Sequence, residues 1–489
     1  MTDLSTIIEN SLDALVSSLI KKGLNSYVTP AIFGAVGDKK TDDTAHLQSA
    51  FDFASANNLY VDLCGKSYLV KNNITIDNIN IINGTIIKYN TNMYVVCKNK
   101  FALDNVTIYT AGDCRDLTIE LVESNNGKIT HSNIYGYILC KTKAVKTKIQ
   151  ESTIYHGNYG VLFNDGDSNR TYNGTSYTDS IGKGLSIRDC DFVVMTAQQN
   201  GDTVEINCPN KGFSDIVLEN NIVELKEGIT KVSDANGSIG FGFAGCDNFR
   251  VMNNDLTGVG SINGTIHYEW CSNGKVKFNN LINNFGHAII GIDSSDVDND
   301  ENFIDGCIRG ISMVSDHALN TRINVRKNKI KHMKEYGIYG AGLLNNTISD
   351  NEIIEPAADS KYSSFTYMFF YDNAIGGLQK SIITGNKFYK GNFTGKLNLP
   401  INAKTPKCIN NIFKNNLGMD FSVYYFDIGT NNHLEHSLVG ANAKFYVLNV
   451  SPIGYLPADK VGAVCFDSTT GNIYKVEAGT NNSKQWVLQ

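Results

Sequence analysis

One short pattern recurs along the chain and constrains the fold more than any other feature. It consists of an apolar residue, two free positions, a small or amide residue, one free position and another apolar residue. It occurs eleven times, and its middle residues lie roughly 20 to 38 positions apart. The eleven instances are Ile129/Ser132/Ile134, Ile149/Ser152/Ile154, Ile187/Cys190/Phe192, Leu218/Asn221/Val223, Val251/Asn254/Leu256, Val276/Asn279/Leu281, Phe303/Gly306/Ile308, Val325/Asn328/Ile330, Ile348/Asn351/Ile353, Ile383/Asn386/Phe388 and Cys408/Asn411/Phe413.

The pattern describes a strand, a sharp corner at the amide residue, and a second strand whose alternate side chains point inward. Asn suits the corner because it tolerates left-handed backbone angles and bonds to nearby main chain. Corners stacked in register predict a parallel β-helix, in which each coil buries its inward side chains against its neighbours. The longer intervals, such as those at 165–177 and 356–371, then project as loops. A β-sandwich or a propeller is the alternative, but a constant local pattern at irregular spacing favours the β-helix.

The composition agrees with an all-β fold. The 489 residues include 59 Asn and 44 Gly, and both residue types favour turns over helix interiors. A hydrophobic content of 42% allows a large core, which excludes disorder as the main state. No run of about 18 apolar residues is present to cross a bilayer, and the N-terminal segment is acidic where a secretion signal needs positive charge. The net charge of -6 argues against a nucleic-acid-binding surface.

The cysteines predict neither a disulfide framework nor a metal centre. There are 11, and no two of them form a CxxC pair. Free thiols pack as small apolar groups in a chain that folds in a reducing cytoplasm. Residues 296–301 alternate oxygen-bearing side chains as a calcium loop does, but Glu301 stands where that loop needs Gly, and Cys307 where it needs a bidentate Glu. We therefore expect no metal and no cofactor.

A helix is expected to close the N-terminal end of the β-helix. The open ends of a β-helix pair with other chains unless they are covered. Residues 42–54 predict such a cap, because Asp42 or Asp43 can cap the start of a helix and four apolar residues then form one stripe. The four residues of the stripe are Leu47, Ala50, Phe51 and Ala54.

The residues around this helix carry a resemblance to a known family. The chain has Phe33-Gly34-Ala35-Val36-Gly37-Asp38, then Thr41-Asp42-Asp43-Thr44, the helix, and residues 59–70. This arrangement resembles the N-terminal motif of pectate-lyase-like proteins, especially bacteriophage tailspikes and capsule depolymerases, and covers about forty residues. Where many relatives have Pro before the Gly that precedes the next strand, this chain has Cys64-Gly65. The resemblance implies a single-stranded right-handed parallel β-helix that forms homotrimers in a virion tail, assembled in the host cytoplasm and acting at the bacterial cell surface.

The chain is expected to divide into three parts. Residues 1–28 predict a helix with one apolar face. By resemblance it packs in an oligomer or docks on a phage tail adaptor. The alternative is an ordinary amphipathic helix that packs on its own chain. Residues 29–420 form the β-helix, its N-terminal cap and a catalytic or binding face. Residues 421–489 form a small C-terminal β module, because residues 462–486 have the pattern of short strands around a tight turn.

Paired acidic residues are the candidates for chemistry. The resemblance implies recognition of a bacterial capsule or O-antigen polysaccharide, with cleavage of a glycosidic linkage. Hydrolysis needs two carboxyl groups, about 5 to 5.5 Å apart for retention or about 6.5 to 9.5 Å apart for inversion. Adjacent coils are about 4.8 Å apart, and Glu269 lies about one coil before Asp293 and Asp296. We expect Glu269 and Asp293 to be the acid and the base, in either order, with Asp296 raising a neighbour's pKa.

The residues beside Glu269 are candidates for substrate binding, namely His267, Tyr268 and Trp270. Trp270 suits sugar stacking, with a core Trp as the alternative. In a regular strand Glu269 and Trp270 face opposite sides, so both line one groove only if the strand bends there. The further acidic candidates are Asp165 with Asp167, Asp202 with Glu205, and Asp316 with His317.

Three functions stay open on these observations. The first is an endo-acting glycoside hydrolase. The second is a polysaccharide lyase on the same fold, which removes a proton beside a uronic acid with Tyr, His or Lys in place of paired acids. The third is a receptor-binding spike without catalysis. The expected partners are a bacterial polysaccharide, further copies of the chain and a phage tail or adaptor protein, with neither nucleic acid nor membrane insertion.

Overall fold

The computed structural model describes residues 26–489, apart from 111–113, 141–144, 165–181, 197–200, 209–212, 231–239, 358–363, 394–395, 398–400, 404, 420–423, 428–431, 436–444, 449–450, 454–462, 468–469 and 479–483. It divides into two compact units, Met1–Thr196 and Ala197–Gln489. Most of the helix expected at 1–28 lies outside the described residues, as do the candidates Asp165 and Asp167.

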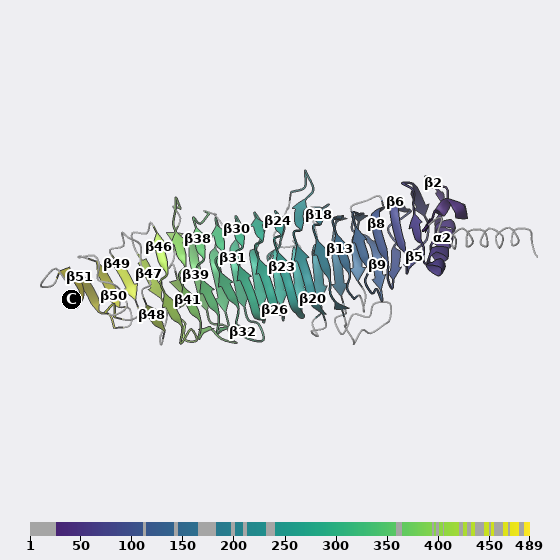
Figure 1. The fold of residues 1–489 in the computed structure, drawn as a ribbon. Coiled ribbons are helices and arrows are strands. Elements are labelled where there is room, and N and C mark those ends of the chain that lie inside the picture. Colours follow the sequence, from purple (N-terminus) through teal and green to yellow (C-terminus); the bar gives the residue numbers. More distant parts are fainter. Residues whose placement is uncertain are drawn as a thin grey trace, which may run out of the picture. The chain divides into compact units, whose positions relative to one another are not determined.

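The first unit is a stretch of right-handed parallel β-helix (Figure 1), which confirms the predicted fold class. Strands one coil apart pair in parallel, and β5, β7, β9, β12 and β15 follow one another in this way. The elements are β1 (Tyr27–Val28), η1 (Pro30–Phe33), β2 (Asp38–Asp42), α2 (Thr44–Asn57), β3 (Tyr60–Asp62), β4 (Ser67–Val70), β5 (Ile74–Asp77), β6 (Asn80–Lys88), β7 (Val95–Lys98), β8 (Ala102–Tyr109), β9 (Leu117–Val122), β10 (Lys128–Thr130), β11 (Asn133–Tyr135), β12 (Tyr137–Cys140), β13 (Lys148–Gln150), β14 (Thr153–His156), β15 (Val161–Asn164), β16 (Gly182–Lys183), β17 (Ser186–Arg188) and β18 (Asp191–Val194).

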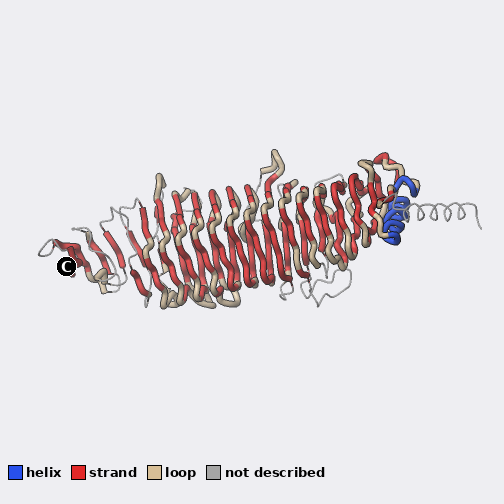
Figure 2. The backbone as a smooth tube through the Cα atoms, in the orientation of Figure 1, coloured by secondary structure: helices blue, strands red, loops and turns tan. Residues whose placement is uncertain are grey.

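The helix α2 stands at the N-terminal end of this unit, where Figure 2 shows it in blue beside the first strands. The four residues of the predicted apolar stripe are all buried, which confirms the cap. Asp43 occupies the N-cap position, but its side chain does not bond to the helix. Its buried carboxylate accepts hydrogen bonds from the backbone N–H groups of Val36 (2.7 Å) and Gly37 (3.0 Å). The motif therefore ties the loop before the helix to the cap.

In the second unit each coil adds strands to two parallel sheets. The first, which we call the site sheet, has one strand per coil. Its strands are β19 (Val204–Asn207), β22 (Phe241–Ala244), β25 (Ile266–Glu269), β28 (His287–Ile292), β31 (Arg309–Val314), β35 (Tyr336–Ala341), β39 (Ser364–Tyr371), β44 (Ile401–Asn402) and β47 (Tyr424–Asp427). The short β43 (Lys396–Leu397) pairs with the start of β39.

The second sheet, which we call the ladder sheet, has two or three strands per coil. Its strands are β20 (Phe213–Glu219), β21 (Ile222–Leu225), β23 (Cys246–Met252), β24 (Asp255–Thr257), β26 (Ser272–Lys277), β27 (Asn280–Ile282), β29 (Ser295–Asp300), β30 (Phe303–Asp305), β32 (Asn320–Thr321), β33 (Asn324–Arg326), β34 (Lys329–Lys331), β36 (Leu343–Leu344), β37 (Thr347–Ser349), β38 (Glu352–Ile354), β40 (Leu378–Gln379), β41 (Ile382–Thr384), β42 (Lys387–Tyr389), β45 (Ile412–Lys414), β46 (Leu417–Met419) and β48 (His433–Glu435). Among the described helices, none has the length and apolar character to cross a membrane.

A small C-terminal β module is present, as the predicted fold class includes. Two strands within the predicted bounds of 421–489, β47 and β48, pair with the site sheet and the ladder sheet. The module contains β49 (Phe445–Leu448), β50 (Val464–Asp467), β51 (Ile473–Ala478) and β52 (Lys484–Leu488). β49 and β50 pair in parallel, whereas β50, β51 and β52 pair antiparallel. The turn between β50 and β51 contains Gly471 at φ 76°, a left-handed conformation that glycine adopts without steric cost.

A ladder of buried asparagines runs through the second unit at the corner within the ladder sheet. Each backbone N–H and each side-chain amide donates to the Oδ1 of the asparagine one coil further on, over 2.8 to 3.2 Å. The side-chain amide also donates to a backbone carbonyl of the preceding coil, as from Asn279 to Val251 (2.9 Å). The ladder residues are Asn221, Asn254, Asn279, Asn302, Asn328, Asn351, Asn386 and Asn416. Their packing satisfies buried amides at every corner.

The ladder corrects three details of the predicted corners. Asn302 is the rung where the pattern predicted Gly306. Asn411 belongs to a second ladder at another corner, where its side chain donates to Asn432 over 2.9 Å. The left-handed residue is the one before the rung, as at Asn253 (φ 55°) and Phe278 (φ 57°). The rung asparagine is thus selected by its bonds to adjacent coils, because the backbone angle falls on its neighbour.

The eleven cysteines carry free thiols, ten of them buried and Cys64 exposed. In the first unit, Cys97 and Cys140 pack in the core of the coils. Burial raises the pKa of the Cys140 thiol well above its ordinary value, so it stays uncharged. The buried cysteines therefore act as small apolar residues, as the sequence predicted.

Candidate functional site

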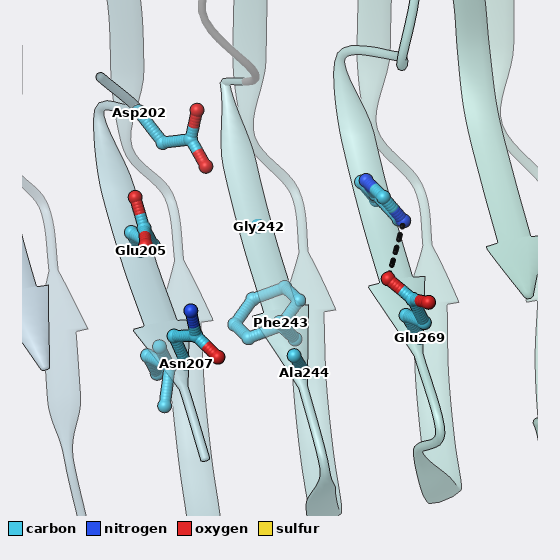
Figure 3. Close-up of a pocket in the computed structure, with 9 residues that line it drawn as sticks. Asp202, Glu205, Asn207, Gly242, Phe243, Ala244 and Glu269 are labelled. Carbon is cyan, nitrogen blue, oxygen red and sulfur yellow. Dashed lines mark ion pairs between the residues drawn. The ribbon is translucent and has the colours of Figure 1, made fainter. Parts of the chain in front are cut away.

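An open pocket of about 130 Å³ lies on the site sheet across β19, β22 and β25. Figure 3 shows the carboxylates of Asp202 and Glu205 on one side, that of Glu269 on the other, and Gly242 between them. The pocket is lined by Asp202, Glu205, Ile206, Asn207, Gly242, Phe243, Ala244, His267 and Glu269.

The floor of the pocket exists because the middle strand has small outward residues. In β22 the side chains alternate, so that Phe241 and Phe243 are buried in the core while Gly242 and Ala244 face the pocket. Parallel register places Gly242 between Glu205 and His267, two coils apart. The missing side chain at 242 leaves a gap between the walls.

Glu269 has the perturbed carboxyl group expected of an acid catalyst. Its side chain is only 25% exposed. Partial burial raises its pKa above the ordinary value, the charges of Asp293 and Asp316 raise it further, and His317 opposes them. A raised pKa keeps a larger fraction of the carboxyl protonated at a given pH, which is what a proton donor requires.

His267 faces the pocket beside Glu269, with 3.8 Å between its Nε2 and Oε2 of the glutamate. Burial lowers the pKa of His267 to about 4, so the imidazole is neutral near pH 7 and the contact is not an ion pair. Its Nε2 is buried and has no hydrogen-bond partner among the described residues. A buried ring nitrogen without a partner is costly unless a ligand or water completes it.

Asp293 lies one coil beyond Glu269, as predicted, but its carboxylate is already occupied. It accepts hydrogen bonds from the backbone N–H groups of Asp316 (2.8 Å), His317 (2.9 Å) and Ala318 (3.1 Å). The indole N–H of Trp270 donates to it over 3.2 Å. These four donors hold the carboxylate in place, so its geometry suits an anchor for the neighbouring loop and indole.

Trp270 stands where β25 bends. Its φ of 52° is left-handed, which turns the chain out of the strand directly after Glu269. The indole is half-buried, and its N–H is fixed by Asp293. The predicted bend is therefore present, but Trp270 is not among the residues that line the pocket.

Tyr268 does not line the pocket, which corrects its assignment as a substrate-binding residue. The side chain is 0% exposed, and its hydroxyl accepts a hydrogen bond from Asn299 over 2.7 Å. The ring packs over Gly291 of the next coil, where a Cβ would lie 2.4 Å from the ring. Alternation along β25 makes Tyr268 a core residue between two outward neighbours.

Asp296 has another role than the one expected from the sequence. It is the second residue of the ladder-sheet strand β29, and Arg322 donates two hydrogen bonds of 2.5 and 2.6 Å to its carboxylate. The hydrogen bond from Arg322 lowers the pKa of Asp296. The neighbours that raise the pKa of Glu269 are instead Asp293 and Asp316.

Sequence reasoning missed the residues that open the pocket, namely Asn207, Gly242 and Ala244. A signal for them is present in β22, where two buried phenylalanines alternate with Gly and Ala, a strand with an almost bare outer face. Asp202 and Glu205 were considered only as an alternative pair. Among the described residues, no cluster of His, Cys, Asp and Glu has the arrangement of a metal site.

Comparisons with known proteins agree with the fold. No protein-family model and no curated protein sequence matches the chain. The structure is similar to tailspike protein 3 of bacteriophage CBA120, with 10% identity, a TM-score of 0.50, and coverage of 96% of this chain and 70% of that one. It is also similar to the catalytic unit of a GH87 α-1,3-glucanase from Streptomyces thermodiastaticus, with 12% identity, a TM-score of 0.53, and coverage of 76% and 70%. The chain therefore shares the parallel β-helix fold with these two proteins.

Proposed function

We propose that this protein is a bacteriophage tailspike that hydrolyses a bacterial capsule or O-antigen polysaccharide at internal linkages. The observation that carries the proposal is the pair of acidic walls across the bare floor at Gly242, one of them a glutamate with a raised pKa. Hydrolysis of a glycoside needs one carboxyl group to donate a proton and a second carboxylate to act on the other side of the sugar.

Glu269 is the proton donor in this proposal, and Asp202 or Glu205 activates the attacking water. Glu205 and Glu269 stand on strands two coils apart, about 9.6 Å, and are offset along the strands by two residues, about 6.6 Å, because the register partner of Glu269 on β19 is Asn207. Their backbones are therefore about 12 Å apart. Carboxyl groups that lean into such a gap suit the separation of inverting enzymes, about 6.5 to 9.5 Å, which leaves room for a water. The neutral His267 then binds a sugar hydroxyl through its unpartnered Nε2.

Asp293 is a positioning residue in this proposal. Its bonds to Trp270 and to the loop at 316–318 hold both beside Glu269. Its charge also helps to keep Glu269 protonated. The half-buried indole is placed to contact a sugar next to the cleaved linkage.

His267 supports one competing function. A polysaccharide lyase uses a neutral base to remove a proton beside a uronic acid carboxylate, and His267 is neutral and faces the pocket. Its low pKa of about 4 makes it a weak base. The opposed carboxylates therefore favour hydrolysis.

The assembly is proposed from the resemblance to tailspikes. We infer a homotrimer located in the virion tail, with residues 1–28 in contact with a tail or adaptor protein. Light scattering of the full chain after size-exclusion chromatography gives three times the monomer mass of 53.7 kDa on this proposal.

The activity is tested on a panel of purified capsular polysaccharides and O-antigens, with alginate and α-1,3-glucan included. Hydrolysis of a panel member produces new reducing ends, and NMR of the first product shows the inverted anomer. Glu269→Gln abolishes cleavage but retains binding in affinity electrophoresis. The control is Glu224→Gln, an exposed residue of the ladder sheet, and this variant cleaves normally.

Other outcomes separate the remaining functions. An unsaturated product with ultraviolet absorbance, lost in His267→Gln and kept in Glu269→Gln, supports the lyase instead. Binding without cleavage of any glycan refutes the enzyme and leaves a receptor-binding spike. Normal turnover in Glu269→Gln refutes the assignment of the proton donor.

A further inference from the structure

A cluster of aromatic side chains lies on the outer side of the site sheet, several coils beyond Glu269. It consists of Tyr336 and Tyr339 on β35 and of Phe369 and Tyr371 on β39. All four are half-buried, so each ring remains partly open to solvent. The other aromatic residues of β39, Phe365, Tyr367 and Phe370, are buried in the core.

The four rings overlap along the direction of the coils. Tyr336 and Phe369 stack with centroids 5.4 Å apart and planes inclined by 15°, and Tyr339 and Tyr371 stack at 5.0 Å. Optimal contact between carbon atoms needs only about 3.5 to 4.0 Å, so the rings are offset, and each presents part of its face. The hydroxyl groups of three tyrosines add hydrogen-bonding edges. Such a surface suits a sugar ring, which has one apolar C–H face and a rim of hydroxyls.

Arg309 completes one end of this cluster. Its guanidinium lies 5.5 Å from the ring centre of Tyr336 and 5.4 Å from that of Tyr339. Its Nε donates to Glu335 over 2.6 Å and its Nη1 to Nε2 of His287 over 3.0 Å. These two bonds use two of the five N–H donors of the guanidinium. The remaining donors are available to the hydroxyls of a sugar beside the rings.

His287 fixes the position of Arg309. Because Nε2 of the imidazole accepts the bond from Arg309, the ring hydrogen sits on Nδ1 and is donated to Oγ of Ser312 over 2.5 Å. Burial and the charge of Arg309 lower the pKa of His287 to about 3, so the ring stays neutral at neutral pH. The arginine is thus held from both sides, as a preorganised binding group is.

The cluster is aligned with the pocket. The row of register partners that starts at Glu269 continues through Ile292 and Val314, and on the following coils Ala341 of β35, which is buried, pairs with Tyr371 of β39. β35 lies three strand spacings from β25, about 14 Å, and β39 lies four, about 19 Å. The three residues between Glu269 and Tyr371, namely Ile292, Val314 and Ala341, are uncharged. A polymer that crosses the pocket along the coils therefore reaches the aromatic cluster.

We propose that the aromatic cluster at Tyr336, Tyr339, Phe369 and Tyr371 binds a sugar ring of the same polysaccharide, several sugars away from the linkage at Glu269. The proposal rests on the function proposed above and deepens it, because it makes a long chain the preferred substrate over a short fragment. Remote binding of this kind lowers KM and leaves the chemical step unchanged.

The test compares Tyr339→Ala and Phe369→Ala with the parent protein on the same polysaccharide panel. Loss of one stacking ring weakens binding about three- to tenfold, measured by affinity electrophoresis with the Glu269→Gln protein as background. In proteins that retain Glu269, KM rises by a similar factor and kcat stays unchanged. Tyr339→Phe keeps the ring and retains most of the affinity, which separates loss of stacking from loss of the fold.

Phe278→Ala is the matched control, since it removes an exposed phenyl group at a corner of the ladder sheet. It leaves binding unchanged. If the parent cleaves a polysaccharide and both cluster variants bind and cleave it normally, the aromatic cluster is not a subsite and the proposed function stands. If the parent binds no glycan of the panel, the proposed function and the subsite both fail.

Discussion

Replacement of one rung of the asparagine ladder tests the physical basis of the fold most directly. Asn302 is 1% exposed and stands in the middle of the ladder. Its Oδ1 accepts the backbone N–H of Asn279 over 3.0 Å. Its side-chain amide donates to Asn328 over 3.0 Å and to the carbonyl of Val276 over 2.9 Å. Its Oδ1 also accepts the side-chain amide of Asn279 over 3.0 Å. Asn302→Ala removes all four bonds while keeping the backbone conformation accessible.

The cost follows from the groups left without a partner. The N–H of Asn279 and the carbonyl of Val276 stay buried after the substitution, and each orphaned group costs about 1 to 3 kcal/mol. The Oδ1 of Asn328 keeps the backbone donor of residue 302. The free energy of unfolding is therefore expected to fall by about 2 to 6 kcal/mol, a large effect for one residue. Asn324→Ala, which removes one partly exposed bond to Asp298, costs about 0.5 to 1.5 kcal/mol.

Urea unfolding monitored by circular dichroism measures both variants, and hydrogen exchange of a peptide spanning residue 279 locates the effect. The Asn279 amide loses protection in Asn302→Ala and keeps it in Asn324→Ala. If Asn302→Ala lowers the free energy of unfolding no more than Asn324→Ala does, buried amide pairing does not stabilise the corners as argued.

Three further predictions concern the pocket and its surroundings. Glu269→Gln stabilises the fold at neutral pH. A carboxyl group whose pKa is raised in the folded state makes the protein less stable as the pH rises from its ordinary pKa through the raised one. The gain in urea midpoint over the parent therefore disappears in acid, and an equal gain at all pH values contradicts the burial argument. Gly242→Leu places a side chain on the pocket floor, which an extended strand accommodates. Cleavage and binding are therefore lost while the circular dichroism spectrum is unchanged, and retained turnover excludes this pocket as the site. His267 has a pKa of about 4 in the folded protein, against about 6.5 in the unfolded chain. The free energy of unfolding therefore falls by about 2 kcal/mol between pH 7.5 and pH 5, because the unfolded chain binds the proton, and His267→Gln removes this loss. Salt-dependent surface pairs such as Asp296 with Arg322 do not produce it.

Much of the fold was predictable because the information is local. The corner pattern repeats within six residues, and it placed the rungs at Asn254, Asn279 and Asn328 without any knowledge of pairing. One coil of 23 residues also separates Trp270 from Asp293, which is why the adjacency of Glu269 and Asp293 could be predicted. The apolar stripe of α2 could also be predicted, because its residues recur at helical spacing within eight positions of the sequence.

The pocket could not be predicted because it depends on alignment across a long insertion. Glu205 and Gly242 are register partners although 37 positions separate them, far more than one minimal coil. Counting residues from Glu269 therefore does not lead back to Glu205. The occupation of Asp293 has a similar cause: its donors are backbone N–H groups at 316–318, which carry no side-chain signature.

The direction of the asparagine ladder has a consequence for the order of assembly. Every rung from Asn221 to Asn386 donates its N–H groups to the rung that follows in the chain. A coil that has just folded thus ends in donors that lack an acceptor until the next coil arrives. During synthesis the N-terminal coils emerge first, and each one presents a template that selects an amide oxygen at the next corner. The hydrogen bonds of the ladder are therefore expected to form one coil at a time, in the order of synthesis.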